Sequence, residues 1–438
     1  MDCRLKIKLL QRHSQVGLVF VLFLSLFFSN KVFSQYNLIV NDSWVVVDNS
    51  AQVFVGGDLI NEQGNGSIKL DGCLRVRGDI QNNSSNNMFL LQQSIPTGRL
   101  IACSNTHEQY ISGIGSPIHF PNLIIEGKPK KLIMNNCQVN NCFTVNAELN
   151  LNSKNFIINN KNPEAINYIS GFIRSESLPP FYGTIQWNTQ NNTGAFTVPF
   201  GSGLGNTNDL DLTLNVQTPG SIEGHYRFAT YPTNDFTNTP FPTSVISLMP
   251  FQDVAMVDRF WFIEPDYISR PNVSIDFSYS MIDIDSPNKI KQSTLQAIRH
   301  NDYNFKWDDW VPGSTSDVNT KIVSTNTIPK QHQYSHWTLV SEDMGGDLWI
   351  PNAFTPDRDE YYTNEYFGPV ITFPYAKYEF YVFDRWGKLI FESDNIDNKW
   401  DGTHGSEVVC QGTYVWLIII TKHSTKKYKY NGIVNVIL

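Results

Sequence analysis

Charged residues are scarce in this chain. They make up 17% of its 438 residues, against about 25% in an average globular protein, and the formal net charge is −8. Binding of nucleic acid without regard to sequence needs clustered Lys and Arg, so no nucleic-acid partner is expected. Ala, Glu, Lys and Leu are also too few for coiled coils or helical repeats. The 13% of aromatic residues and the 44 Asn residues instead indicate an all-β protein.

Long apolar runs are also lacking, apart from Val16 to Phe28, which is shorter than the about 18–20 residues that span a bilayer. Basic residues within 4–12 precede this run, and Val32 and Ser34 place small side chains at −3 and −1 of a cleavage point. This is the pattern of a secretory signal peptide, so we expect cleavage between Ser34 and Gln35. No Cys follows the run at a cleavage position, so a lipoprotein anchor is not expected.

Cysteine is sparse as well. Five residues remain after position 34, an odd number and far too few for a disulfide-based scaffold: Cys73, Cys103, Cys137, Cys142 and Cys410. The Cys137 and Cys142 pair has no second pair or His cluster at a matching spacing, so we expect no zinc site. Buried thiols and a local disulfide both stay open.

Residues 35–178 repeat themselves. The segment Val53 to Asn61 aligns with Leu74 to Asn82 at an offset of 21, and looser copies begin at Leu123, Phe143 and Phe156. A period near 20 with short alternating strands predicts a β-solenoid, in which each coil buries its apolar face against its neighbours. Asn suits the corners of the coils because it tolerates a left-handed backbone. An ordinary sandwich with an accidental repeat is the alternative.

From Pro179 the pattern changes to longer strands between Pro and Gly turns, which predicts an antiparallel β-sandwich over residues 179–345. The expected strands are Gly183 to Trp187, Ala195 to Phe200, Leu210 to Val216, Gly224 to Tyr231, Arg259 to Ile263, Val273 to Tyr279, Leu295 to His300 and His336 to Val340. Ser341 to Gly346 is polar and rich in Gly, and we interpret it as a linker.

Residues 346–438 form a third unit of the size of one small sandwich. The segment Tyr378 to Asp384 has the alternation of a strand, with aromatic residues on both of its faces. This pattern predicts a strand that is covered on each face. Arg385-Trp386-Gly387 forms a turn before the next strand, and Tyr414 to Thr421 with Tyr428 to Leu438 form a hairpin. The fold class we expect is therefore all-β, with solenoid-like repeats, a middle antiparallel sandwich and a carboxy-terminal Ig-like β-sandwich.

Five motifs of this unit occur in the order found in a known family. They are Ile350-Pro351-Asn352-Ala353-Phe354-Thr355-Pro356, Phe383 to Phe391, Trp400-Asp401-Gly402, Gly412-Thr413-Tyr414-Val415 and Tyr430-Asn431-Gly432. With them, residues 347–438 resemble the gliding-motility-associated carboxy-terminal domain, also called the type B sorting domain of the type IX secretion system. The resemblance implies passage to the periplasm by the amino-terminal signal, followed by transport across the outer membrane by the type IX translocon.

The resemblance assigns sorting-domain positions to Pro351, Asn352, Phe354, Thr355, Pro356, Asp384, Arg385, Trp386, Gly387, Trp400, Asp401, Gly402, Gly412, Tyr414 and Gly432. We assign Asp384, Arg385 and Trp386 to turn formation and packing, with recognition by the translocon as the alternative role. The family usually carries a Gly-rich acidic loop after Pro356. Here Asp357, Asp359 and Glu360 lack the glycines, so we expect an exposed acidic loop rather than a calcium site.

Catalytic candidates are few. His332 and His336 are four apart, but the flanking residues favour a strand and no Glu follows the first His, so zinc protease chemistry is excluded. Asp308 and Asp309 between Trp307 and Trp310 could hold a sugar, although two packed indoles at a surface turn are the favoured interpretation. No cofactor is expected.

These observations predict a secreted or cell-surface protein that is not an enzyme. We expect a signal peptide (1–34), a solenoid region (35–178), a sandwich region (179–345) and a sorting domain (346–438). Together they form an adhesin or stalk-like ectodomain with an extracellular glycan or surface ligand, and the family resemblance adds a link to gliding motility. The alternative is a secreted carbohydrate-active enzyme that uses the same sorting domain.

Overall fold

The structure is a computed structural model of the full chain. It describes residues 31–34, 36–90, 96–177, 181–203, 209–233, 256–284, 290–301, 306–308, 314–341, 348–357, 364–371, 375–421 and 427–437. The basic and apolar segments of the expected signal peptide, Gln35, and the expected linker after Ser341 lie outside the described residues, so these stay predictions. The described part of the chain consists of β-strands and short 3-10 turns, which confirms the all-β class. In this part, no helix has the length and hydropathy needed to cross a bilayer.

The chain divides into two compact units. The first comprises Met1–Pro242, Phe260–Ser280 and Pro329–Ser335, and the second comprises Thr243–Arg259, Met281–Ile328 and His336–Leu438. The domain boundaries expected from the sequence stay predictions.

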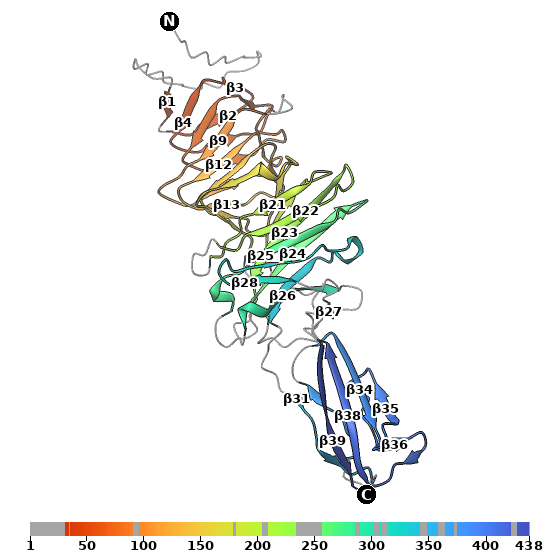
Figure 1. Cartoon of the computed structure of the whole chain (residues 1–438). Helices are drawn as coiled ribbons and strands as arrows, with labels where there is room; N and C mark the ends of the chain where they lie inside the picture. Colours follow the sequence, from red (N-terminus) through yellow and green to blue (C-terminus); the bar gives the residue numbers. More distant parts are fainter. Residues whose placement is uncertain are drawn as a thin grey trace. The chain divides into compact units, whose positions relative to one another are not determined.

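The first unit begins with a parallel β-solenoid whose strands stack on separate faces (Figure 1). The first face contains β1 (Lys31–Ser34), β4 (Gln52–Val55), β7 (Cys73–Val76), β9 (Arg99–Ala102), β12 (Leu123–Glu126), β15 (Phe143–Asn146) and β18 (Ile166–Tyr168). The second contains β2 (Leu38–Val40), β5 (Leu59–Asn61), β8 (Ile80–Asn82), β10 (Gln109–Ser112), β13 (Lys130–Leu132), β16 (Leu149–Asn150) and β19 (Ile173–Arg174). On the third, β3 (Trp44–Val47) pairs with β6 (Ser67–Leu70), and β11 (His119–Phe120), β14 (Cys137–Val139), β17 (Asn155–Ile158) and β20 (Thr184–Trp187) follow.

On the first two faces, the register of the first coils is the offset of 21 residues read from the sequence. Val53 pairs with Leu74 in adjacent coils, and Leu59 pairs with Ile80. The inward side chains of these strands are buried, with Leu74 and Ile80 both 0% exposed, because successive residues of a strand point to opposite faces. The solenoid is confirmed, and the alternative of an ordinary sandwich for this region is wrong.

Asx side chains hold one corner of the coils together. The backbone N–H of Asp58 donates to Asn37 Oδ1, that of Asp79 to Asp58 Oδ1, and that of Tyr110 to Asp79 Oδ1, each at 2.8 Å. Backbone groups at a corner leave the strand ladder and need another partner. A side-chain oxygen from the preceding coil supplies it, which explains why Asn and Asp recur at this place in the repeat.

The solenoid continues directly into an antiparallel sheet within the first unit. Strand β20 pairs in parallel with β17 and antiparallel with β23 (Gly224–Pro232), and β24 (Arg259–Tyr267) follows β23. A second sheet contains β21 (Gly194–Val198), β22 (Leu212–Val216) and β25 (Val273–Ser278). Rings from the two sheets meet, because the centroids of Trp187 and Phe196, and those of Trp261 and Phe277, are 5.2 Å apart. These strands form the expected sandwich.

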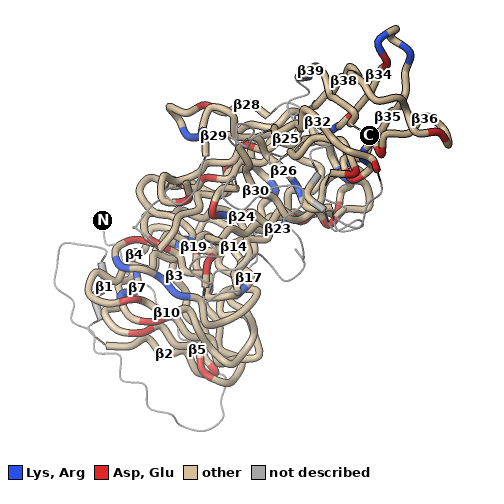
Figure 2. Tube along the Cα trace, turned by 90° about the horizontal axis from the view of Figure 1, so that it is seen from below, with Lys and Arg blue, Asp and Glu red and all other residues tan. Residues whose placement is uncertain are grey.

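The second unit contains two strand groups before its carboxy-terminal part. In one, β26 (Leu295–Asn301) pairs antiparallel with β27 (Lys306–Asp308) and β30 (His336–Ser341). In the other, β28 (Thr315–Asp317) and β29 (Ile322–Ser324) form a hairpin. Figure 2 shows that Lys, Arg, Asp and Glu are sparsely distributed along the described chain.

The carboxy-terminal part of the second unit is built on one antiparallel sheet with a parallel edge strand. Its strand order is β32 (Ala353–Phe354), β39 (Lys427–Val436), β38 (Gly412–Thr421), β34 (Lys377–Phe383) and β35 (Leu389–Ser393). The expected hairpin is β38 and β39, which pair over their full length from Gly412–Val436 to Thr421–Lys427. Two short pairs accompany the sheet: β31 (Leu348–Trp349) with β33 (Val370–Ile371), and β36 (Thr403–His404) with β37 (Glu407–Val408).

Candidate functional site

The sequence motifs of the carboxy-terminal part come together in one aromatic core. Phe354, Phe367 and Tyr414 surround Trp400, with ring centroids 5.2, 6.4 and 5.2 Å from that of the indole. Trp400 is 0% exposed, and its Nε1–H donates to the backbone oxygen of Thr403 at 2.9 Å. Three motifs that are distant in the sequence are therefore joined by packing around a buried, hydrogen-bonded indole.

A tight turn after Trp400 explains the Asp401-Gly402 pair. Asp401 Oδ1 accepts hydrogen bonds from the backbone N and the Oγ1 of Thr403 at 3.0 and 2.7 Å. Gly402 has a φ of +74°, which L side chains rarely adopt, and a Cβ there would lie 2.5 Å from Pro356 Cγ. The Pro of the first motif thus packs directly on the Gly of the third.

A second turn joins β34 to β35 and is fixed by Asp384. The Asp384 carboxylate accepts the backbone N–H groups of Trp386 at 2.8 Å and Lys388 at 2.9 Å, while Asp384 N donates to Lys388 O at 2.9 Å. Gly387 has a φ of +79° and nothing within 4 Å of a Cβ, so its backbone conformation alone favours glycine. These bonds give Asp384 the turn-forming role that the sequence indicated.

Trp386 differs from the expectation. The sequence predicts that it packs in the domain, but its side chain is 85% exposed. Among the described residues its ring is approached by Arg385, whose Cζ is 6.0 Å from the ring centroid. The turn geometry accounts for this, because the residue at its tip points away from both strands. Sequence reasoning could not separate Trp386 from Trp400, since both are Trp next to a turn Gly.

The remaining motif residues form backbone hydrogen bonds and close contacts at the edges of the sheet. Asn352 O and Phe354 O accept the N–H groups of Asn435 and Ile437 at 2.9 and 3.1 Å, next to Pro351. Thr355 N donates to Asn364 O at 2.9 Å. Gly432 has no room for a side chain, because a Cβ would lie 2.5 Å from Trp416 Cζ2. Gly412, with a φ of +156°, begins β38.

The acidic loop after Pro356 is described only at its start. Asp357 is exposed, and Asp359 and Glu360 lie outside the described residues. Among the residues that the structure describes, no three His, Cys, Asp or Glu side chains converge in a way that would hold a metal ion. Cys137 is buried and Cys142 is half-buried, and both are free thiols. Burial raises the pKa of the Cys137 thiol to about 11, which keeps it protonated.

The structure does not arrange the described candidate residues for sugar or zinc binding in the way those sites require. Trp307 is 3% exposed and its ring lies edge-on to His300 at 5.6 Å, so the face of this indole is not available to a sugar. Asp308 ends β27, while Asp309 and Trp310 lie outside the described residues. His332 ends a 3-10 turn (Lys330–His332) and His336 begins β30, so the two do not share a helical face.

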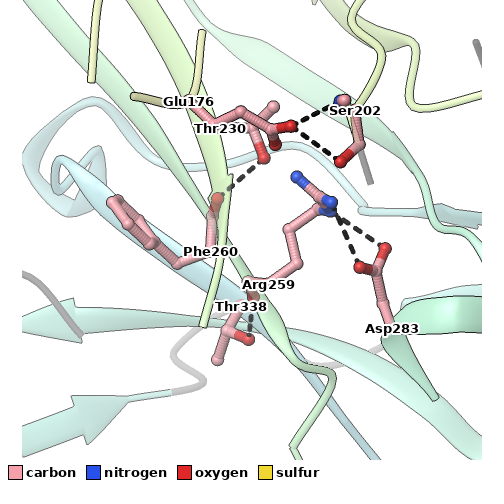
Figure 3. Close-up of polar contacts among 8 residues, drawn as sticks. Glu176, Ser202, Thr230, Arg259, Phe260, Asp283 and Thr338 are labelled. Atoms are coloured by element: carbon pink, nitrogen blue, oxygen red, sulfur yellow. Dashed lines mark hydrogen bonds and ion pairs between the residues drawn. The ribbon is translucent and has the colours of Figure 1, made fainter. Parts of the chain in front are cut away.

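The polar contacts in the middle of the chain include a buried ion pair (Figure 3). In the second unit, Arg259 Nε and Nη2 donate to the two oxygens of Asp283 at 2.9 and 3.1 Å, and both side chains are at most 2% exposed. Thr338 Oγ1 donates to the backbone oxygen of Arg259 at 2.8 Å. In the first unit, Ser202 Oγ donates to Glu176 Oε1 at 2.8 Å. A fork-to-fork Arg–carboxylate pair satisfies both buried charges by hydrogen bonding.

The comparisons with known proteins agree with the geometry of the carboxy-terminal part. Residues 348–436 match the family model of the CHU_C type IX secretion signal domain. No curated protein and no solved structure matches the chain. The domain that holds the aromatic core and the two turns is thus a type IX secretion signal, which implies interaction with the type IX secretion machinery. It indicates export, followed by secretion or attachment at the outer cell surface.

Proposed function

We propose that this chain, exported by its carboxy-terminal type IX secretion signal, is a non-enzymatic adhesin or stalk-like protein of the cell surface. The observation that carries the proposal is the way the solenoid uses its polar residues. Asn37, Asp58 and Asp79 each accept a backbone N–H from the next coil. Groups that would otherwise serve as acids, bases or ligands are thereby part of the scaffold.

The charged residues of the solenoid support the same proposal. Glu126 pairs with Arg75, Glu148 pairs with Arg174 at 2.9 Å, and Asp71 pairs with Lys69 at 3.1 Å. A shallow hollow of about 110 Å³ near Asn49 and Arg99 has Asp71 as its one carboxylate. Hydrolysis of a glycosidic bond uses two carboxylates about 5–10 Å apart, which this hollow does not bring together.

Ligand binding is assigned to exposed aromatic side chains of the solenoid. Tyr36 is 81% exposed, Trp44 is 45% exposed and Tyr110 is 37% exposed. Aromatic faces pack on the apolar faces of sugar rings and of protein ligands. A glycan or a protein of a neighbouring surface is the ligand class that fits.

The test is binding of the purified mature chain to a glycan array and to whole cells, with polysaccharide hydrolysis measured in parallel. We expect binding that Trp44→Ala weakens several-fold, while Val408→Ala, at an exposed position outside the solenoid, leaves it unchanged. Release of reducing sugar by the wild-type chain would contradict the non-enzymatic proposal and favour the carbohydrate-active alternative. A link to gliding motility rests on the family resemblance alone, and the spreading of a strain lacking this chain tests it.

A further inference from the structure

The sheet of the secretion signal domain has one apolar face that the described chain leaves open. This face, called the apolar face below, consists of Tyr381, Phe383, Val415, Leu417 and Ile433. Phe383 pairs with Val415, which pairs with Ile433. In the next row Tyr381 pairs with Leu417, and the polar Glu392 and Asn431 border this pair on its two sides. Val415 is 42% exposed and Ile433 is 58% exposed, while Phe380 and Ile418 on the opposite face are both 0% exposed.

The openness of this face contradicts the sequence-based expectation for β34. Aromatic residues on both faces of the strand predicted that it is covered on each side, but Tyr381 and Phe383 are only half-buried. A solvated face of an antiparallel sheet is normally polar. The composition of the apolar face is therefore that of a covered surface, and the described residues do not supply the cover.

The other end of the same sheet face shows the normal pattern. There Glu379 pairs with Ile419 and Ile419 with Lys429, and the next row contains Lys377 and Lys427. Lys377 Nζ lies 2.8 Å from Glu379 Oε1. Apolar character is thus concentrated at the end of the strands where β34 turns into β35.

Trp386 stands at that same end. The Asp384 turn follows Phe383 directly and presents the indole with 85% of its surface exposed, and Leu389, opposite Phe383, is 39% exposed. Two hydrogen bonds to the Asp384 carboxylate hold the turn, so little conformational freedom would be lost on binding. Trp and Arg are the residue types most enriched at the energetic centres of protein interfaces, and Arg385 is exposed beside Trp386.

We propose that the apolar face and Trp386 together form the surface by which the domain docks onto the type IX secretion machinery. This inference rests on the export function of the domain. A secretion signal must be recognised through groups that remain accessible after folding, which excludes Phe354 and Trp400 of the core. The partner surface that fits is a protein groove with an apolar floor, a pocket for one indole and carboxylates near Arg385.

The experiment measures export of the full chain in a bacterium that has a type IX secretion system. The variants are Trp386→Ala and the double variant Val415→Thr/Ile433→Thr, which keeps β-branched side chains and so preserves strand propensity. The matched controls are Trp349→Ala and Val408→Thr, whose side chains are 60% and 47% exposed outside the apolar face. Protease resistance of the periplasmic form and its thermal midpoint report whether each variant folds.

We expect both face variants to be folded and processed, but to reach the cell surface at about a tenth of the wild-type level or less, with the controls at the wild-type level. Wild-type export of both folded face variants would overturn the inference. A wild-type dimer that the face variants convert to monomers without loss of export would also overturn it, because a second copy would then be the cover. Normal export of a chain lacking residues 347–438 would contradict the assignment of export to this domain. Retention of that chain together with export of the face variants would contradict only the docking surface proposed here.

Discussion

Trp400 and Trp386 are the same residue type near similar turns, yet their surroundings predict opposite effects on stability. Trp400 is 0% exposed in the aromatic core, so Trp400→Ala should lower the free energy of unfolding of the carboxy-terminal part by about 3–5 kcal/mol. Trp386 is 85% exposed, so Trp386→Ala should change it by no more than about 0.5 kcal/mol. Urea unfolding followed by tryptophan fluorescence measures both. Equal losses for the two variants would show that Trp386 packs.

Lys130 gives the solenoid a pH dependence. Its side chain is buried and its Nζ donates to the backbone oxygens of Glu126 and Lys128 at 2.8 and 2.6 Å. Burial lowers the pKa of Lys130 to about 8, while the nearby Cys103 and Glu126 act in the opposite direction. Between about pH 8 and 10.5 the unfolded chain therefore holds a proton that the folded chain has released.

The free energy of unfolding should accordingly rise with pH above about 8, by at most about 1.4 kcal/mol per pH unit from this group, and show no slope from it below pH 8. Lys130→Met should remove this contribution. The measurement is the urea midpoint for unfolding of the solenoid in the full chain, followed by pulse proteolysis at pH 7.5, 8.5 and 9.5. Comparing wild type with the variant cancels the contribution of the buried thiols, whose raised pKa makes the free energy of unfolding fall with pH. Parallel profiles for the two proteins would contradict the assignment.

The turn between Trp400 and β36 depends on glycine for two separate reasons, and the chain offers a control that separates them. Gly402 has a φ of +74° and its Cβ position meets Pro356, whereas Gly405 has a φ of +67° with nothing within 4 Å. Gly405→Ala should cost about 1 kcal/mol from the backbone alone, and Gly402→Ala should cost at least about 1 kcal/mol more. Thermal midpoints of the two variants test this, and equal costs would exclude the Pro356 contact as a cause.

Inside the solenoid, neighbouring coils are linked by a buried amide ladder. Asn61 Nδ2 donates to Asn82 Oδ1 at 2.8 Å, and Asn82 Nδ2 donates to Ser116 O at 2.7 Å. Asn82→Ala would remove both hydrogen bonds and leave the buried Asn61 amide without this partner, at a cost of about 2 kcal/mol in the free energy of unfolding. Asn49→Ala, in an exposed turn, should cost less than about 0.5 kcal/mol. A similar small effect at both positions in urea unfolding would argue against the ladder.

The sequence was most informative where a repeated register or a glycine set the structure. The offset between Val53 and Leu74 predicted the stacking of coils because a parallel ladder places equivalent residues opposite each other. The sequence could not predict whether the second face of β34 is covered by the same chain. A strand buried within its own chain and a strand buried by a binding partner have the same composition. Burial of Trp400 and exposure of Trp386 depend on contacts between motifs that alternation within one strand does not encode.

Strand β1 illustrates how processing bears on an element. Lys31–Ser34 pairs in parallel with Gln52–Val55, yet these residues precede the expected cleavage point. In a chain cleaved after Ser34 the edge of β4 is therefore open at the first coil. Open edges promote association with other strands, and charged or covered edges normally prevent it.

The full chain combines a solenoid whose neighbouring coils are linked by Asx hydrogen bonds with a domain that matches a type IX secretion signal. Export is thus assigned to the carboxy-terminal domain, and the adhesion that we propose is placed in the solenoid. The secretion signal domain has its own aromatic core around Trp400, so its role in export can be tested without changing the residues that form the solenoid.

The direct test is the cellular location of a chain lacking residues 347–438, measured by surface protease accessibility and fractionation in a bacterium with a type IX secretion system. We expect this chain to be cleaved after Ser34 and retained in the periplasm, while the full chain reaches the surface or the medium. Appearance of the truncated chain at the surface at the full-length level would contradict the export role of the carboxy-terminal domain.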